Sequence, residues 1–242
     1  APIHLNTSIV KLDYIPSDRH RIFVRGNLQD DSTVYAEQFP GTGPSQVMQD
    51  DSKGIAAGDT WTINPRIIND LRYGFVRQGT STRGPATGEY IDFRFMSAPT
   101  SENRSRVVSI PVNNIIDNLS WTKGNHTLQF GVNWRLIHQN NSTDANSWNG
   151  ATTNPYWLGG STPDPSSIGQ PSVDSSWGNS YQIDYANLVG AVPQITDVFN
   201  YKITSATSGT ALPEGAFIPR HFKANEFEWY AQDSWRATPN LT

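Results

Sequence analysis

The segment from Asn114 to Asn140 limits most strongly what this chain can fold into. In its second half, apolar side chains occupy every other position, at Leu128, Phe130, Val132, Trp134 and Leu136. Successive side chains of a β-strand point to opposite faces of a sheet, so this pattern predicts a strand with one apolar and one polar face. Ile116 to Trp121 is also extended, and Gly124-Asn125 between the two halves suits a tight turn. The segment is therefore predicted to be an antiparallel hairpin.

This hairpin fits two classes of protein. In a water-soluble sandwich the apolar face would be core and the polar face would meet solvent. In a membrane barrel the apolar face would meet lipid and the polar face would line the lumen. The polar residues Asn133 and Arg135 are then candidates for contact with a ligand in the lumen, and Asn125 is a third lumen-facing candidate.

Similar alternation recurs along the chain and predicts an all-β fold, an antiparallel meander of about seven strands within one β region, residues 1–242. Short turns are predicted at 15–20, 64–66, 122–126 and from Ala237 onwards. Residues 31–53, 79–105 and 140–222 have no period and are rich in Gly, Pro and Ser, so they are predicted to be long loops. Aromatic residues near the predicted strand ends fit either interface girdles or cross-strand packing. They are Tyr14, Trp61, Tyr73, Trp121 and Trp235.

The predicted order is strand, short turn, strand, long loop, repeated along the chain. All short turns then fall on one edge of the sheet and all long loops on the other. A soluble sandwich has no reason to keep its connections so unequal, whereas outer-membrane barrels have short periplasmic turns and long outer loops. The pattern therefore favours part of an outer-membrane β-barrel.

Composition excludes several other classes. The 242 residues carry a net charge of −4 and no Lys/Arg cluster, so nucleic-acid binding is not expected. Cysteine is absent, which excludes a disulfide scaffold and thiolate sites. No apolar run approaches the roughly 18 residues of a membrane-spanning helix, although barrel strands escape this criterion. Ala1-Pro2-Ile3-His4 does not resemble a signal peptide, so we expect either its removal or a longer parent chain.

Catalytic and metal-binding signatures are weak. No common nucleotide, hydrolase or zinc motif occurs, and the five histidines lie in different segments, so no cofactor and no metal site is predicted. Asp30-Asp31 and Asp50-Asp51 fit either a calcium loop or solvated charge. Glu226 and Glu228 share a face about 7 Å apart. Two of the three residues Glu226, Glu228 and Asp233 are a weak alternative as the acid and base of a glycosidase. Lumen-facing or solvent-facing charge explains the two glutamates equally well.

The longest predicted loop is rich in aromatic and amide side chains. Trp and Tyr rings stack on sugars while Asn, Asp and Gln bind hydroxyls, so an oligosaccharide or other small ligand fits this region. The alternative is a loop folded on its own aromatic residues. The candidate ligand-binding residues here are Trp148, Tyr156, Trp157, Trp177, Tyr181 and Tyr185.

Four segments resemble the barrel of TonB-dependent outer-membrane receptors, and most closely the Oar-like subgroup. They are residues 12–26, 59–75, 116–135 and 226–242. In the last one, Gln232, Asp233, Trp235 and Thr238 to Thr242 match a family pattern in which a strand ending in QD-W is followed by T-P-N-L-T. The resemblance covers essentially all predicted strands but not the long loops, and four motifs in order are more specific than any one.

The resemblance implies ligand capture and TonB-dependent uptake across the outer membrane of a Gram-negative bacterium. Its partners would be a lipid bilayer, a small-molecule or glycan ligand and, at full length, a TonB-type energy-transducing complex. Family members close about 22 strands around a plug. Seven strands without plug or closing strand are expected of an internal fragment, whose open sheet edges favour self-association. The alternative is a free-standing secreted β protein that binds or hydrolyses polysaccharide.

Overall fold

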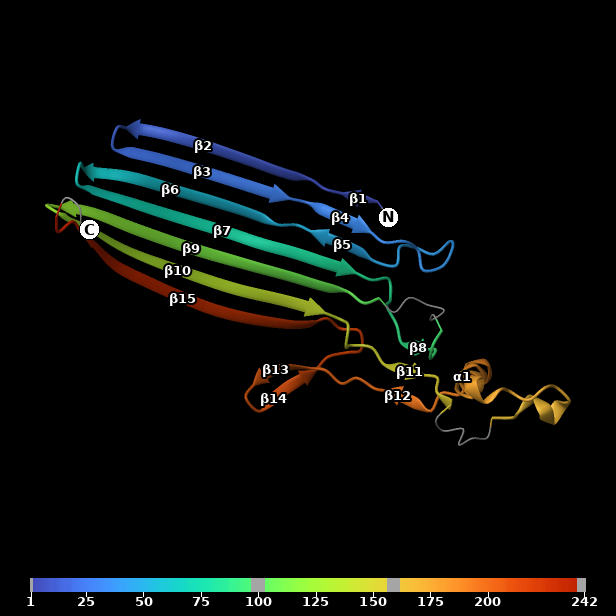
Figure 1. Ribbon diagram of the computed structural model, residues 1–242. Helices are drawn as coiled ribbons and strands as arrows, with labels where there is room; N and C mark the ends of the chain where they lie inside the picture. The colour runs from blue at the N-terminus through green and yellow to red at the C-terminus, as the bar shows by residue number, and fades with distance from the viewer. Residues whose placement is uncertain (1, 97–102, 156–161, 239–242) are drawn as a thin grey trace.

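Seven long antiparallel strands form a single sheet (Figure 1). The structure is a computed structural model and describes residues 2–96, 103–155 and 162–238. Neighbours in the sheet follow the chain order. The strands are β2 (Thr7–Ser17), β3 (His20–Gln29), β6 (Lys53–Asn64), β7 (Ile67–Arg83), β9 (Arg106–Lys123), β10 (His126–Thr143) and β15 (Ile218–Trp235).

The predicted meander and its unequal edges are confirmed. Two-residue connections join β2 to β3, β6 to β7 and β9 to β10, and all three lie at one edge of the sheet, the turn edge. Gly124 adopts a φ of +61°, which explains a glycine in the last of these turns. The three long connections all leave from the opposite edge, the loop edge. Strand β2 continues to Ser17, so this turn begins later than the break predicted after Tyr14.

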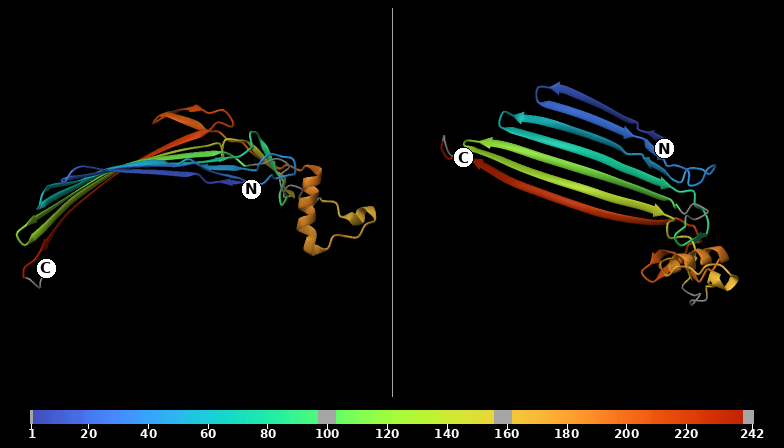
Figure 2. Two further views of the ribbon diagram at one scale, coloured as in Figure 1. Left: turned by 90° about the horizontal axis from the view of Figure 1, so that it is seen from above. Right: turned by 45° about the vertical axis from the view of Figure 1, so that its right-hand side comes forward.

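Successive hairpins are staggered in the same sense along the sheet. His20 begins β3 but lies opposite Trp61, three residues before β6 ends at Asn64. Ile67 begins β7 but lies opposite Trp121, two residues before β9 ends. A stagger that keeps the same sense is the shear that accompanies tilted strands in a barrel wall. Edge-on, the sheet is one curved layer (Figure 2).

Part of the predicted loop 31–53 continues the sheet beyond the long strands. In line with β2, β3 and β6 lie β1 (Ile3–His4), β4 (Asp31–Val34) and β5 (Val47–Asp50), which pair in the order β1, β4, β5, β7. The predicted loop therefore contains a hairpin that lengthens the sheet at its loop edge. Alternation does not show this hairpin because each strand has only four residues and each face mixes polar and apolar side chains.

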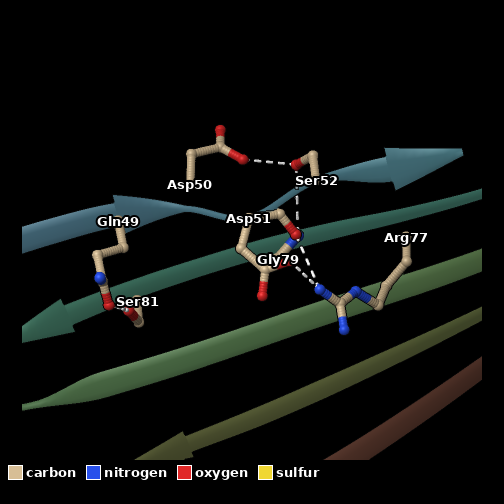
Figure 3. A network of polar contacts seen from close by, with 7 residues as sticks. All are labelled: Gln49, Asp50, Asp51, Ser52, Arg77, Gly79 and Ser81. Carbon is tan, nitrogen blue, oxygen red and sulfur yellow. Dashed lines mark hydrogen bonds and ion pairs between the residues drawn. The ribbon is translucent and has the colours of Figure 1, made fainter. Parts of the chain in front are cut away.

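A polar network holds the junction between β5 and β6 (Figure 3). Arg77 donates to the backbone carbonyl of Asp51 at 2.9 Å and forms an ion pair with its carboxylate. The Ser52 hydroxyl donates to Asp50 at 2.5 Å, and Asp51 N–H donates to the Gly79 carbonyl at 2.7 Å. A Cβ at Gly79 would lie 2.7 Å from the Asp51 carbonyl oxygen, so only glycine allows this approach.

The same contacts bear on the candidate calcium loops. Asp31 lies opposite Asp50 across β4 and β5. Its carboxylate accepts from Asn6 N–H at 2.8 Å and from the Gln29 amide at 2.6 Å. Asp50 and Asp51 also have protein donors, so Asp31, Asp50 and Asp51 all take part in contacts within the protein. Among residues 2–96, 103–155 and 162–238, no three His, Asp or Glu side chains are grouped so that they could hold a metal ion.

The other two long connections also contain regular elements, although they were predicted to be loops. Strands β7, β10 and β15 themselves extend into the ranges 79–105 and 140–222. One small sheet combines β8 (Tyr90–Asp92), β11 (Gly150–Thr152) and β12 (Gln194–Thr196), and β13 (Tyr201–Ser205) pairs with β14 (Ser208–Ala211). The same connection, between β10 and β15, contains η2 (Pro165–Ile168), η3 (Ser175–Trp177) and α1 (Gly178–Val189).

The hydrophobic core does not lie on the large sheet. Among the described residues, the buried apolar side chains are Ala86, Ile183 and Ala186, all in the long connections. Large apolar residues of the sheet remain exposed, for example Trp229 at 72% and Phe227 at 67%. No helix in the described part of the chain is both long and apolar enough to cross a membrane. The described strands of the large sheet therefore form no sealed core of the kind that a soluble sandwich requires.

Candidate functional site

The two faces of the large sheet differ in chemistry. Directly opposed residues of neighbouring strands share a face, so the register sorts every side chain. The face that carries Phe130 is called the apolar face. Its large apolar members include Val10, Leu12, Tyr14, Ile22, Val24, Leu28, Ile55, Trp61, Ile67, Leu71, Tyr73, Phe75, Val107, Ile115, Leu119, Trp121, Leu128, Phe130, Val132, Trp134, Leu136, Phe227, Trp229 and Trp235.

The opposite face is called the polar face, and charged pairs cross it. Arg135 donates to Glu226 at 2.8 Å between β10 and β15. Asn133 donates to Glu228 at 3.0 Å in the next layer of the same two strands. Arg72 pairs with Asp70 at 2.7 Å on β7. The predicted lumen-facing positions Asn133 and Arg135 thus lie side by side in a polar ladder, whereas Asn125 lies in the β9–β10 turn.

Tyr230 extends this ladder across three strands. Its ring covers Gly131 on β10, and its hydroxyl donates to the Asn118 side chain on β9 at 3.1 Å. A Cβ at Gly131 would overlap the tyrosine ring and lie 2.6 Å from the Asn118 oxygen. The glycine is therefore required for this crossing. Tyr230 and Asn118 were not predicted as functional residues, because only the register shows that a glycine faces an aromatic residue.

The weak catalytic alternative is not assembled. Glu226 and Glu228 share the polar face, but each is engaged by the donor described above. Asp233 lies on the apolar face, where it contacts His126 at 2.7 Å. The sheet separates Asp233 from the two glutamates, so the three carboxylates cannot act on one substrate.

Trp148 has a packing role at the base of the long connection. The Arg104 guanidinium lies 5.1 Å from the Trp148 ring and 5.3 Å from the Tyr90 ring. Gly215 lies so close to the six-membered ring of the Trp148 indole that a Cβ at this glycine would overlap the ring. A ring held in this way is not available to stack on a sugar. For Trp148, the structure matches the alternative of a loop folded on its own aromatic residues.

The remaining aromatic candidates fall into two groups. Trp177 ends η3 and is 67% exposed. Tyr181 and Tyr185 are one turn apart on α1, with ring centroids 6.4 Å apart, and Tyr181 donates to the Pro163 carbonyl at 2.8 Å. Tyr156 and Trp157 lie outside the described residues. Trp177, Tyr181 and Tyr185 therefore lie on two consecutive elements, η3 and α1, and the two tyrosine rings are in contact.

Helix α1 is attached to the small sheet by polar contacts of Asn187. The Thr153 hydroxyl, which is buried, donates to the Asn187 side chain at 2.5 Å. The Asn187 amide donates to the Arg94 carbonyl at 3.1 Å. Ile183 and Ala186, on the same side of α1, are buried. Gly190 ends the helix with a φ of +70°.

Replacing Asn187 with Ala is expected to release α1 from the small sheet. The change removes both hydrogen bonds and leaves the buried Thr153 hydroxyl only its longer contact with the Asp92 carbonyl, at 3.3 Å, at a local cost of about 1–3 kcal/mol. Limited proteolysis should then cleave within residues 178–190 several-fold faster than in the unmodified protein. Asn179→Ala is the matched control, because Asn179 is exposed on the same helix. Equal cleavage of the two variants would contradict the attachment.

Two aspartates begin the short 3₁₀ helices before α1. Hydrogen bonds from the side chain and backbone of Ser166 hold the pKa of Asp164 below its ordinary value of 3.8. Ser176 lowers the pKa of Asp174 in the same way. A lowered pKa means that each carboxylate is charged and caps its helix at neutral pH. The cap is lost only as the pH falls through the lowered pKa, which lies below 3.8. These carboxylates therefore order the chain before Trp177.

Pockets at the loop edge involve residues that were not predicted. One, of about 470 Å³, lies between the tip of the β4–β5 hairpin and the segment after β7, and includes Gln38, Phe39 and Thr87. Another, of about 410 Å³, lies on the small sheet and includes Tyr90, Asn149 and Asp197. Residues from separate connections form each pocket, so no single segment of the sequence carries a signal for it.

Together these features define a class of protein. A sheet with an apolar and a polar face, staggered hairpins, short turns at one edge and long connections at the other is the wall of an outer-membrane β-barrel. In agreement, a family model for the outer membrane beta barrel domain matches residues 2–242. The chain belongs to this family, which places it in the outer membrane of Gram-negative bacteria. Neither curated proteins nor solved structures gave a match.

The family fixes the surroundings of each face. The apolar face meets lipid and the polar face lines the lumen. The turn edge lies toward the periplasm, and the long connections lie outside the cell. The glutamates and Arg135 are therefore lumen-facing residues, and the secreted alternative is not supported.

Proposed function

We propose that the protein is an outer-membrane receptor that captures an oligosaccharide with its outer connections and takes it up in a TonB-dependent step. The observation that carries this proposal is the grouping of α1, η3 and the small sheet at the loop edge, with Trp177 exposed at the start of α1 and Tyr181 and Tyr185 in ring contact on that helix. The exposed indole and the phenol rings offer stacking surfaces for sugar rings, while neighbouring amides can bind hydroxyls.

Uptake is supported by the polar face. Ion pairs and amides line it from β7 to β15, so the proposed path across the membrane is hydrated. The four segments that resemble TonB-dependent receptors all lie in this wall, including Glu226 to Thr238 at its last described strand. The energy source and the sugar specificity are both part of the proposal.

Replacing Trp177 with Ala is expected to weaken oligosaccharide binding about tenfold, the equivalent of about 1.4 kcal/mol. Cells that carry the protein would be titrated with fluorescent maltohexaose, xylohexaose and chitohexaose, and bound label would be counted. Tyr201→Ala is the control, because Tyr201 is also an exposed aromatic residue of an outer connection but lies on β13. Binding of no sugar, or equal loss in both variants, would refute capture at α1.

The uptake step is tested separately in the same cells. Internalised sugar should fall to background when a protonophore removes the proton gradient, while surface binding should persist. Internalisation that survives the protonophore would contradict energised transport and leave the binding result intact.

A further inference from the structure

Strand β3 presents two arginines to the lumen. Arg21 and Arg25 lie on either side of Phe23, and all three residues belong to the polar face. Both arginines are exposed. Among the residues that the structure describes, neither guanidinium takes part in a hydrogen bond or an ion pair. They therefore differ from Arg72 and Arg135 on the same face, each of which has a carboxylate partner.

The carboxylates on this part of the polar face are already paired. Asp13 on β2 forms an ion pair with Lys11 at 2.8 Å, and Asp70 on β7 pairs with Arg72 at 2.7 Å. The residues of β6 that lie opposite Arg21, Phe23 and Arg25 are uncharged and small. They are Thr60, Gly58 and Ala56. The polar face of β2, β3, β6 and β7 therefore leaves the charges of Arg21 and Arg25 without a matching carboxylate.

The position of Lys11 makes this excess of positive charge more costly. Lys11 lies directly opposite Arg25, on β2 and β3. Like charges in directly opposed positions destabilise a sheet. Asp13 neutralises Lys11, but it lies opposite Phe23 rather than opposite an arginine. An anionic group bound at Arg25 would remove the remaining repulsion.

The wall beside Arg25 leaves room for such a group. In the row of residues that starts at Arg25, the next two strands carry only Ala56 and Gly74. Nothing lies within 4 Å of a Cβ built at Gly74. In the row below, the Phe23 ring reaches across to Gly58, where a Cβ would lie 2.6 Å from it. A sugar chain can therefore lie against small side chains and a phenyl ring, within reach of both guanidinium groups.

Both arginines lie on the path across the membrane. Arg21 is near the periplasmic end of β3, and Arg25 is near the middle of the strand. Their Cα atoms are about 13 Å apart, because a strand rises about 3.3 Å per residue. This separation suits a chain of several sugar units. A charged surface in a channel with low-dielectric walls raises the local concentration of ions of opposite charge.

We propose that Arg21 and Arg25 bind acidic groups of an anionic oligosaccharide, so that the substrate of uptake is a sugar chain that carries carboxylates or sulfates. This inference rests on the function proposed above, because the sugar must enter the lumen. Each guanidinium donates two parallel hydrogen bonds to the oxygens of one acidic group. Phe23 contacts the apolar side of a sugar ring between the two acidic groups.

The charge of the ligand is tested with the unmodified protein. Protein purified from outer membranes in a nonionic detergent is titrated by calorimetry with hexagalacturonate and with its methyl ester, the same sugar chain without charge. A carrageenan hexasaccharide and its desulfated form give the same comparison for sulfate. We expect at least one anionic sugar to bind at least tenfold more tightly than its neutral form.

Two negative results have different meanings. If neither anionic sugar binds more tightly than its neutral form, this inference is wrong, while capture of neutral oligosaccharides is unaffected. If none of these sugars binds, and none of the three neutral hexasaccharides named above binds, the proposed function is wrong as well.

Arg21→Gln and Arg25→Gln test the position of the site. Each change should weaken binding of the anionic sugar at least threefold, the double variant should weaken it at least tenfold, and the neutral form should bind as before. Arg220→Gln is the matched control, because Arg220 is also an exposed arginine of the polar face but lies near the loop-edge end of β15. Unchanged affinity in the double variant, with folding verified by heat-modifiable gel mobility, or equal losses in Arg220→Gln and Arg25→Gln, would overturn the assignment.

Discussion

Phe130→Arg is expected to destabilise the membrane-embedded sheet by about 2–4 kcal/mol, the cost of a cation on the lipid-facing side of a barrel strand. Phe130 lies between Leu119 on β9 and Ala231 on β15, and the nearest acidic residues on this face, Asp117 and Asp233, are diagonal to it. Asp117 already accepts from Asn69 and Asp233 contacts His126, so neither is free to neutralise the new charge. Loss of the phenyl ring adds to this cost. The folded fraction in outer membranes, measured by heat-modifiable gel mobility, and the urea midpoint in lipid vesicles should both fall.

Gln129→Arg is the matched control for this change. Gln129 precedes Phe130 on the same strand but points to the polar face, where its neighbours across the sheet are Ser120 and Gln232. Water in the lumen solvates the added guanidinium, so the change in unfolding free energy should stay within about 0.5 kcal/mol. If the two variants were equally destabilised, the assignment of lipid to the Phe130 side of the sheet would be wrong.

Gly131→Ala is expected to cost about 1–3 kcal/mol, because the methyl group occupies the space of the Tyr230 ring. Displacing that ring also breaks the hydrogen bond from its hydroxyl to Asn118, which links β15 to β9 across β10. The urea midpoint in lipid vesicles measures the effect. Gly74→Ala is the control, since Gly74 lies on the same face of β7 and nothing lies within 4 Å of an added Cβ.

A double variant separates the clash from any intrinsic effect of the glycine. When Tyr230 is already Ala, Gly131→Ala has no ring to displace and should add little further cost. The interaction energy of the cycle should therefore nearly equal the cost of the single glycine change. If the costs of Gly131→Ala and Tyr230→Ala were additive, or if Gly131→Ala and Gly74→Ala cost the same, the Tyr230 ring would not depend on the absence of a side chain at Gly131.

The sequence was sufficient to predict those parts of the strands that cross the membrane. Between Leu128 and Leu136, lipid on one side and water on the other impose strict alternation, so both the strand and its faces are readable. The pattern stops at His138, yet β10 continues to Thr143, and β15 begins at Ile218, before the predicted Asn225. Beyond the bilayer both faces meet water, so the hydrogen-bonded ladder continues while the apolar period ends.

The contacts within the candidate sites were harder to predict from the sequence, because alternation shows the face of a residue but not its partner. Glu226 and Arg135 were found because alternation assigns a face, but their pairing depends on register, which alternation does not give. Helix α1 was missed because only Ile183 and Ala186 are buried, too few for a helical period to appear. Tyr73 was expected near a strand end, but β7 begins six residues earlier and places it well inside the strand.

The chain direction of the two outermost strands, β2 and β15, determines which further strand can pair with them. Strands β2 and β15, the outermost of the seven, both run from the extracellular side toward the periplasm. If a second copy lay in the membrane in the same orientation, β2 or β15 of one copy could pair with β2 or β15 of the other only as parallel strands. An antiparallel neighbour for β15 must instead ascend from the periplasm, so circular closure with uniform antiparallel bonding needs an odd number of added strands.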